Sequence, residues 1–166
     1  MNDSFVLRDR IWREQNERVS LSSIATFADS TEGRINHEEK DLFRTEFERD
    51  RDRILHSKAF RRLKHKTQVF INPDGDHFIT RMSHTLQVTQ IGRSIAKALG
   101  LNPDLTEAIC LGHDVGHSPF GHTGEDVLNE MLDNGWSHSE NSVKIFKHIE
   151  PKNLTIETLN GIEKHP

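Results

Sequence analysis

The chain has 166 residues, and its 22 Lys and Arg against 26 Asp and Glu give a formal net charge of -4. This length suits one domain with a real core, and the charge argues against a general nucleic-acid binder, which displays an excess of basic charge. No apolar run approaches the roughly 20 residues needed to cross a bilayer, and the N-terminus lacks the apolar stretch of a signal peptide. We therefore expect a soluble, cytoplasmic protein.

Histidine is the residue type that stands out in the composition. The chain contains 11 His, and six of them fall between His77 and His138 inclusive. Cys110 is the only cysteine, which excludes an internal disulfide and a thiolate zinc cluster. Any metal must therefore be held by His and carboxylate side chains, and the chemistry of the chain is expected among these histidines.

The first part of the chain shows little regular periodicity. Residues 1–37 mix charge, Ser and Thr with isolated apolar residues, which predicts an irregular N-terminal arm ahead of a domain over residues 38–166. Apolar residues then recur at helical spacing from about Asp41 to Leu63, which predicts a helix. The segment VFINPDGDHF joins a short β-like run to a turn, so a loop or small hairpin is expected there.

Two helices that carry histidines are predicted next. Between residues 84 and 99, apolar residues fall at steps of three or four on the same face as His84, which is therefore expected to point inward. Gly100 ends this helix, and the Asn-Pro-Asp sequence that follows has the capping residue and the proline of a new helix start. The new helix carries His113 on its apolar face.

The rest of the chain also favours helices. One is expected from Val127 toward Gly135, another from Ser137 or Ser139 to just before Pro151, and a short one near residues 156–162. No internal repeat interrupts this pattern. The predicted fold class is therefore all-α.

The sharpest local feature is LGHDVGHSPFGHTGED, residues 111–126. A neutral imidazole and an anionic carboxylate at adjacent positions, as in His113 and Asp114, can converge on one divalent ion. The glycines around them permit tight turns and leave room for a substrate. The alternative is a capped helix end followed by a His-rich loop, but the inward His84 favours a metal site.

The order of these motifs resembles a known family. The signature of HD-domain deoxynucleoside triphosphate triphosphohydrolases is similar to Arg81-Met-Ser-His84, His113-Asp114, His117-Ser-Pro-Phe-Gly-His122-Thr-Gly-Glu125 and His138 of this chain, in that order. The upstream stretch RDRILHSKAFRRLKHKTQVF, which begins at Arg51, also resembles the dGTP triphosphohydrolase-like members. The resemblance covers residues 38–166 and implies an HD-domain helical bundle.

The resemblance implies a role for each matching residue. The metal ligands would be His84, His113 and Asp114, the catalytic pair His122 and Glu125, and the substrate-binding residues Gln68, Arg81, His117 and His138. A guanidinium suits phosphate oxygens, and an imidazole can donate to a reacting centre. Taken alone, the residues leave other interpretations open: a core histidine at His84, a first-turn acid at Glu125, and exposed side chains at His138 and Gln68.

Basic residues and the lone cysteine leave further alternatives. The basic run comprises Lys58, Arg61, Arg62, Lys64 and Lys66. It could receive a triphosphate, a regulatory nucleotide or single-stranded nucleic acid, or form a solvated charged face. Cys110 has apolar neighbours, so a buried small side chain is expected rather than a nucleophile.

The resemblance implies metal-dependent hydrolysis of a deoxynucleoside triphosphate such as dGTP to deoxynucleoside and intact triphosphate. Mn²⁺ or Mg²⁺ is the first expectation for the metal, with Fe, Ni or Zn as alternatives, and a homo-oligomer is expected. The family's metal site uses a further Asp on a later helix, whereas no Asp follows Asp133 here. The chain therefore resembles an N-terminal portion of a family protein, truncated on its C-terminal side. The alternatives are an inactive nucleotide- or metal-binding remnant and an HD phosphomonoesterase or phosphodiesterase.

Overall fold

The computed structural model describes residues 8–66 and 80–165. In that part of the chain the structure contains eight α-helices and no strand, and an isolated bridge pairs Arg34 with Thr155. The helices are α1 Arg10–Ser20, α2 Glu46–Leu55, α3 Lys58–Arg62, α4 Arg81–Ala98, α5 Pro103–Gly112, α6 Gly121–Met131, α7 His138–Lys144 and α8 Ile156–Glu163. The all-α prediction is confirmed. Gln68 and the predicted hairpin VFINPDGDHF lie outside the described residues.

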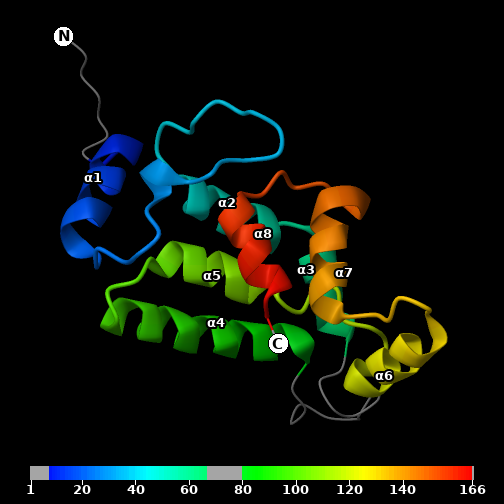
Figure 1. The fold of residues 1–166 in the computed structure, drawn as a ribbon. Coiled ribbons are helices and arrows are strands. Elements are labelled where there is room, and N and C mark those ends of the chain that lie inside the picture. Colours follow the sequence, from blue (N-terminus) through cyan, green and yellow to red (C-terminus); the bar gives the residue numbers. More distant parts are fainter. Residues whose placement is uncertain (1–7, 67–79, 166) are drawn as a thin grey trace.

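The helices pack around α5. Figure 1 shows α4 alongside α5, with α2 and α8 on the other side of α5. α3 and α7 lie at one end of this arrangement, and α6 projects beyond α7. The start of α4, the end of α5, the start of α7 and the end of α8 meet at this end, which brings distant parts of the chain together. None of the described helices is both long enough and apolar enough to cross a membrane.

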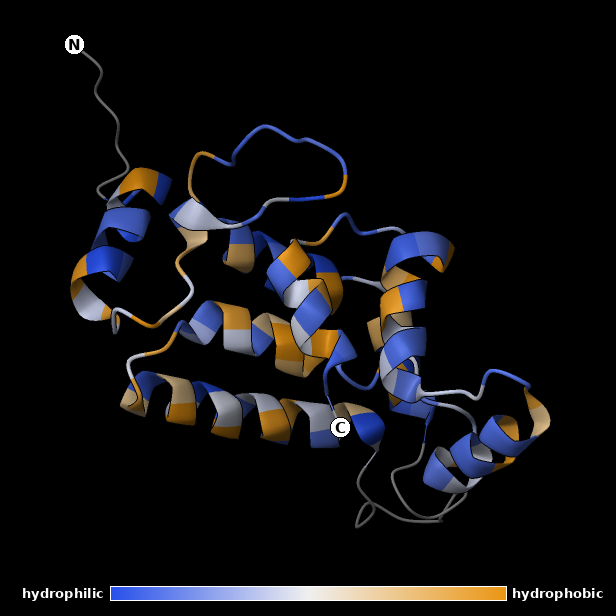
Figure 2. Cartoon of the chain, viewed as in Figure 1, coloured by the Kyte–Doolittle hydropathy of each residue, from blue (hydrophilic) through white to orange (hydrophobic). Residues whose placement is uncertain are grey.

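The apolar core lies between α2, α3, α5, α7 and α8. Its buried members include Ile54, Phe60, Leu63, Ala108, Leu111, Val115, Val143, Phe146, Leu154, Leu159 and Ile162. Each large apolar side chain that becomes fully buried contributes roughly 1.5–3 kcal/mol to stability. The apolar residues of α5 are visible in Figure 2 as orange segments that lie between its neighbours. This core holds the C-terminal end of α5, and with it His113, in a fixed position.

The predicted helix from Asp41 to Leu63 is interrupted in the structure. α2 ends at Leu55, and α3 begins after Ser57, whose hydroxyl accepts a hydrogen bond from the backbone N–H of Phe60. Ser57 is fully buried, so it acts as an N-cap inside the core. Apolar spacing alone does not reveal such an internal cap, which explains the difference from the prediction.

The orientation predicted for α4 is wrong over most of its length. Its buried side chains are those of Arg81, Thr85, Thr89 and Ala96, whereas Ile91 and Ile95 are 56% and 54% exposed. The physical reason is the close approach of α5: a Cβ on Gly92 would lie 2.9 Å from the Sγ of Cys110. Small and hydroxyl-bearing residues therefore face α5. His84, on the edge of that face, is half-buried.

The predicted irregular N-terminal arm is also wrong for part of its length. Residues 10–20 form α1, which Asp9 caps by accepting a hydrogen bond from the backbone N–H of Trp12. Further along, the buried guanidinium of Arg34 pairs with Glu46 at 2.6 Å and with Asp50 at 2.5 Å. Ion pairs rather than apolar periodicity attach this segment to α2, so a search for apolar stripes does not detect it.

Candidate metal centre and histidine–glutamate cluster

The first group of functional side chains lies between α4 and α5. His84 in the first turn of α4 faces His113 and Asp114, which directly follow α5, and one possible ligand atom from each lies within 4.8 Å of the others. We call these three residues the metal triad. His113 and Asp114 are buried, and His84 is half-buried. The structure therefore brings together the three residues that the sequence predicts as metal ligands.

A backbone carbonyl sets the tautomer of His113. The Nδ1 of His113 lies 2.6 Å from the carbonyl oxygen of Cys110, and because a carbonyl only accepts, this nitrogen carries the proton. The Nε2 then presents a lone pair on the side of Asp114, whose Oδ2 is 3.6 Å away. Burial lowers the pKa of His113 despite the opposing effect of Asp114, so the neutral form predominates. Two imidazoles and a carboxylate with such outer support fit a divalent transition metal.

Arg81 lies behind the metal triad. Its guanidinium is almost fully buried, and its Nη1 donates to Oδ2 of Asp114 at 3.1 Å. Burial alone would raise the pKa of Asp114, but His113, when it is protonated, and the guanidinium of Arg81 outweigh it and hold that pKa below its ordinary value. Asp114 is thus ionised at neutral pH, which is the form that binds a cation.

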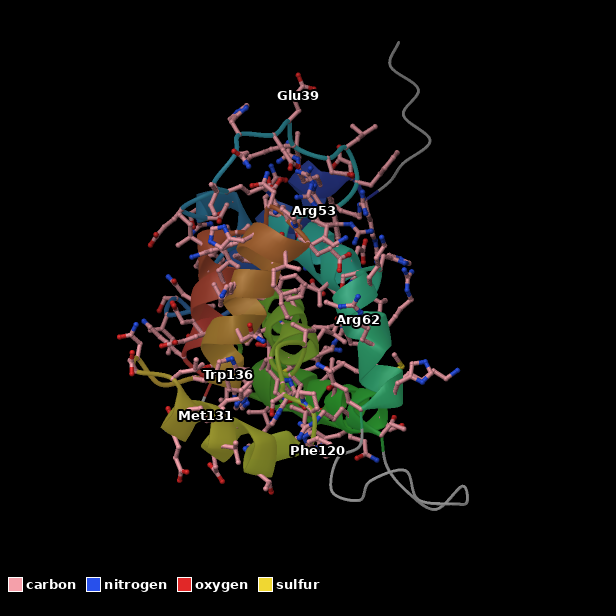
Figure 3. All side chains as sticks on the ribbon, turned by 90° about the vertical axis from the view of Figure 1, so that its right-hand side faces the viewer. Glu39, Arg53, Arg62, Phe120, Met131 and Trp136 are labelled. Carbon is pink, nitrogen blue, oxygen red and sulfur yellow. The ribbon has the colours of Figure 1, made fainter. Side chains whose placement is uncertain are left out.

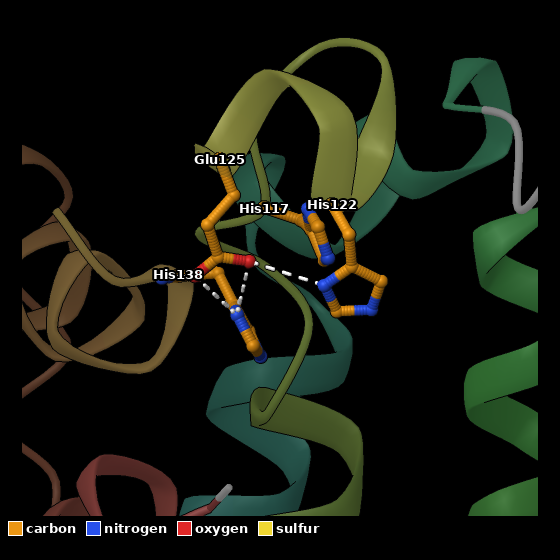
Figure 4. Close-up of side chains that lie close together, drawn as sticks. All are labelled: His117, His122, Glu125 and His138. Atoms are coloured by element: carbon orange, nitrogen blue, oxygen red, sulfur yellow. Dashed lines mark hydrogen bonds and ion pairs between the residues drawn. The ribbon is translucent and has the colours of Figure 1, made fainter. Parts of the chain in front are cut away.

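The second group is formed by His117, His122, Glu125 and His138, which we call the histidine–glutamate cluster. Each offers one ligand or proton-exchanging atom, and these atoms lie within 4.8 Å of one another. Figure 4 shows the Glu125 carboxylate between two imidazoles, with the Nδ1 of His138 at 2.9 Å and that of His122 at 3.3 Å. Glu125 also accepts the backbone N–H of His138 at 2.9 Å. One carboxylate therefore orients both histidines.

Buried donors without partners mark the space near the two groups. The Nε and Nη2 of Arg81 and both ring nitrogens of His117 are buried, and none of these four atoms has a hydrogen-bond partner among the residues that the structure describes. Burial lowers the pKa of His117 to about 4, and the positive charge of Arg81 adds to this effect. A buried polar atom without a partner is unfavourable by about 1–3 kcal/mol. A ligand with several acceptor oxygens would satisfy the two guanidinium nitrogens and the one ring nitrogen of His117 that carries a proton while the ring is neutral.

The turn after α5 connects the two groups. The backbone N–H of Gly116 donates to the hydroxyl of Ser142 at 2.8 Å, and its carbonyl accepts from the side-chain amide of Asn141 at 2.7 Å. A Cβ on Gly116 would lie 2.2 Å from the backbone nitrogen of Ser142, so only glycine fits against α7 here. This close approach brings His117 beside His138, with ring centroids 4.6 Å apart.

A second tight turn leads into α6. Phe120 has a positive φ of 69° immediately before the helix, a conformation that non-glycine residues adopt only at a cost. One turn later, a Cβ on Gly124 would lie 2.0 Å from the carbonyl oxygen of Pro119. The compact turn at the start of α6 presents His122 and Glu125 toward His138.

Two residues of the site are absent from the sequence prediction or assigned differently there. The ring of His165, just after α8, lies 4.7 Å from that of His113 and 5.4 Å from that of His138, and burial lowers its pKa. No motif contains His165, and only the fold brings it to the site. Lys66 donates from Nζ to the carbonyl of His117 at 2.7 Å, so this member of the basic run supports the turn. The other members are exposed: Lys58, Arg61, Arg62 and Lys64.

Comparison with known proteins gives the same family as the motifs. Residues 81–166 match the HD domain family. A deoxyguanosinetriphosphate triphosphohydrolase-like protein of Caldanaerobacter subterraneus subsp. tengcongensis is 56% identical over 156 residues, which cover 92% of this chain and 46% of that protein. The protein of the same name from Clostridium tetani is 53% identical over 167 residues, which cover 98% of this chain and 47% of that protein. The protein of this name from Pelagibacter ubique is 56% identical over 144 residues, which cover 81% of this chain and 39% of that protein.

These matches confirm the predicted resemblance. The chain spans about half the length of the curated relatives that it matches. The matched family region begins at α4 and contains both the metal triad and the histidine–glutamate cluster. The chain therefore belongs to the HD-domain family, and it is similar over most of its length to members named dGTP triphosphohydrolase-like proteins.

Proposed function

We propose that this chain carries out the metal-dependent hydrolysis of a deoxynucleoside triphosphate, with dGTP as the first candidate, to deoxynucleoside and intact triphosphate. The coarser assignment, a hydrolase of the HD phosphohydrolase family, follows from the family match and the relatives. The names of those relatives support the finer one, because they describe dGTP triphosphohydrolase-like proteins. The proposal assigns each site residue a separate task in this reaction.

The single observation that carries the proposal is the set of unpartnered donors near the two groups. Within residues 8–66 and 80–165, Nε and Nη2 of Arg81 and the ring nitrogens of His117 are buried and have no hydrogen-bond partner. Phosphate oxygens are the acceptors that best match a buried guanidinium, because they bind it through paired, charge-assisted hydrogen bonds. Arg81 and His117 would therefore bind the phosphates of the substrate, together with His138.

The metal triad would hold the divalent ion that this family requires. HD domains bind divalent metals, and His84, His113 and Asp114 supply a donor set that suits one. The ion, when bound, supplies Lewis-acid polarisation of a phosphate and of a water molecule. Mn²⁺ or Mg²⁺ is the first candidate, with Fe, Ni or Zn as alternatives.

Proton transfer falls to His122 and Glu125 in this proposal. The carboxylate of Glu125 faces the Nδ1 of His122, which leaves Nε2 to exchange a proton with the reacting oxygens. Attack of water at the α-phosphorus forms one P–O bond and breaks the bond to the deoxyribose oxygen, which must gain a proton. His122 would carry a proton between these oxygens, and Gln68 would bind the sugar. Replacing His122 by Ala should lower turnover by roughly 10²–10⁴-fold while the triad still binds its ion.

The proposal also includes the setting in which the reaction takes place. We expect a cytoplasmic homo-oligomer that acts on free nucleotides. Single-stranded nucleic acid is a weaker candidate ligand for the exposed basic residues of α3 and the turn after it. Sedimentation of the purified protein with and without nucleotide measures the oligomeric state directly.

The test is product analysis. The purified chain is incubated with each dNTP and Mn²⁺ or Mg²⁺, and deoxynucleoside and triphosphate are separated by chromatography. Their joint appearance, its loss in His113→Ala and its persistence in His148→Ala, an exposed histidine, would support the proposal. Pyrophosphate or orthophosphate would contradict it and favour an HD phosphodiesterase or phosphomonoesterase. Nucleotide binding without products would favour a binding remnant.

A further inference from the structure

We propose that the histidine–glutamate cluster is itself a second binding site for a divalent transition-metal ion, with Zn²⁺ as the best-fitting class, separate from the metal triad. The four ligands would be His117 from the turn after α5, His122 and Glu125 from α6, and His138 from the start of α7. No residue is shared with the triad. The inference goes beyond the proposed function, because it concerns ion binding and not turnover.

The spacing of the donor atoms fits a tetrahedral ion. Bonds of about 2.0–2.1 Å to one Zn²⁺ place two neighbouring ligand atoms about 3.4 Å apart. Glu125 already lies 2.9 Å from the Nδ1 of His138 and 3.3 Å from that of His122, and an ion bound there would replace the protons of these two hydrogen bonds. The possible ligand atoms of the four residues all lie within 4.8 Å of one another. The most widely separated pair would therefore have to approach by at most about 1.4 Å to reach the tetrahedral spacing. Rotation of exposed His122 can provide part of it.

His117 provides the second, independent observation. Its side chain is 3% exposed, and neither ring nitrogen has a hydrogen-bond partner in the described part of the chain. Its ring stacks on that of His138 with an interplanar angle of 13° and meets the edge of the His122 ring at 4.9 Å. The lone pair of an imidazole lies in the plane of its ring, so one of these two nearly parallel rings must rotate before both can bind the same ion. A bound metal would then accept a lone pair of this buried imidazole and stabilise it.

Charge also favours a dication over added protons. Three imidazoles face a single carboxylate, so protonation of all three would gather three positive charges around one negative charge. One divalent ion leaves the imidazoles neutral and gives the site a net charge of about +1. His122 is 75% exposed, which leaves a path from solvent to the cluster.

Ion binding at this site has a structural consequence for α6. Two of the ligands lie on α6, and the other two lie outside it, so an ion would fasten this helix to α7 and to the turn after α5. The outer face of α6 is otherwise exposed at Val127 and Met131. An ion there would also bind His122 and Glu125, the pair to which the proposed function assigns proton transfer, so a filled site would be an inhibited one.

The test measures binding and needs no turnover. Metal-free chain is titrated with Zn²⁺ and, separately, with Co²⁺, and bound ions per chain are counted after equilibrium dialysis. We expect two ions in the wild type and in His148→Ala, and one each in His122→Ala and His84→Ala. Tetrahedral Co²⁺ absorption should persist in His84→Ala and weaken in His122→Ala. Circular dichroism verifies that each variant is folded, and His122 lies on the surface, so its removal should leave the core intact.

The outcomes separate the two proposals. One ion per chain in the wild type, lost only in His84→Ala, would overturn the second site while leaving the proposed function standing. Loss of both ions in either single variant would show one shared site and would also overturn it. Two independent Zn²⁺ ions, together with no release of triphosphate from any dNTP in an assay that contains Mn²⁺ or Mg²⁺ and no Zn²⁺, would uphold the site and refute the proposed function. As a second readout, Zn²⁺ should slow amide hydrogen exchange across residues 121–131 in the wild type and not in His122→Ala.

Discussion

The metal triad and the histidine–glutamate cluster use the same side-chain chemistry in opposite surroundings. In the triad, Asp114 is buried against a buried guanidinium, and its neighbours sit on α4 and α5, which pack directly on each other. In the cluster, Glu125 is half-buried, and His122 beside it is 75% exposed on a helix whose outer face is open. Figure 3 places Phe120 and Met131 of this region at the end of the molecule opposite Glu39. His122 and Glu125 on α6 are thus held more loosely than His113 and Asp114, although the other two members of the cluster, His117 and His138, are buried.

This difference indicates which of the two groups already has its ligand-binding geometry before a ligand binds. A metal triad on packed helices keeps its geometry without the ion, since its ligands are fixed by the core and by the Cys110 carbonyl. A cluster on an exposed helix can change shape when a ligand arrives, because few contacts oppose the movement. Charge changes should therefore destabilise the first group strongly and the second weakly.

The largest expected effect comes from removing the charge of Asp114. In metal-free protein, Asp114→Asn leaves the buried guanidinium of Arg81 without its counter-charge, and we expect the free energy of unfolding to fall by about 3 kcal/mol. Glu125→Gln is the matched change in the cluster. It retains an acceptor oxygen for the backbone N–H of His138, so a loss of about 1 kcal/mol is expected. Urea unfolding with a chelator present measures both, and equal losses would refute the contrast.

A smaller effect is expected where the two groups are joined. The hydroxyl of Ser142 accepts the N–H of Gly116, and it lies within donating distance of the carbonyls of His113 and His138. Ser142→Ala leaves the buried N–H unsatisfied, which should lower stability by about 2 kcal/mol. Ser94→Ala on the exposed side of α4 is the control, with a change within about 0.5 kcal/mol. A Ser142 variant as stable as this control would show that the link contributes nothing.

A smaller effect is expected from the pH dependence of stability, which reports on His117 of the histidine–glutamate cluster. Burial holds the pKa of His117 at about 4, against an ordinary value of 6.5, so the folded chain binds protons less readily than the unfolded chain. His117 therefore contributes stability that is fully present above pH 6.5 and is lost as the pH falls toward 4. Unfolding in urea across this window, with a chelator, should give a positive slope of stability with pH.

The control for the pH experiment is His117→Asn. Its slope between pH 6.5 and 4.5 should be flatter than that of the wild type, because one depressed histidine is gone. Burial raises the pKa values of Glu17 and Asp104, which makes stability fall as the pH rises. This contribution is the same in both proteins, so it cancels when the slope of the variant is subtracted from that of the wild type. Identical slopes in the two proteins would mean that His117 titrates normally.

Local signals predicted some elements well and left others out. The start of α5 could be predicted because Asn102 and Pro103 act within one turn, and the side chain of Asn102 does accept the N–H of Asp104. α1 could not be predicted, because its segment is attached by ion pairs such as that of Arg13 with Glu48, whose partners are far apart in sequence. The prediction of which face of α4 is buried was wrong, because the close packing of α4 on α5 admits small residues at the contact and not the apolar ones.

The candidate site divides in the same way. Its motif residues could be named from the sequence because the family signature keeps them in one order, and the structure gathers all of those that it describes. The contributions of Lys66 and His165 depend on contacts between the turn after α5, the end of α8 and the metal triad. Such contacts exist only in the folded chain, so no spacing rule could have supplied them.

The smallest effect is expected on the outer face of α6. Met131 is 75% exposed, so Met131→Lys removes little buried apolar surface and should change the free energy of unfolding by less than about 0.5 kcal/mol. Leu111→Ala in the core on α5 should lower it by about 2–5 kcal/mol in the same urea experiment. If Met131→Lys lowers the free energy of unfolding by more than about 2 kcal/mol, α6 is packed as firmly as the helices of the triad. The contrast between a rigid triad and an adaptable cluster would then fail, because both would rest on equally buried supports.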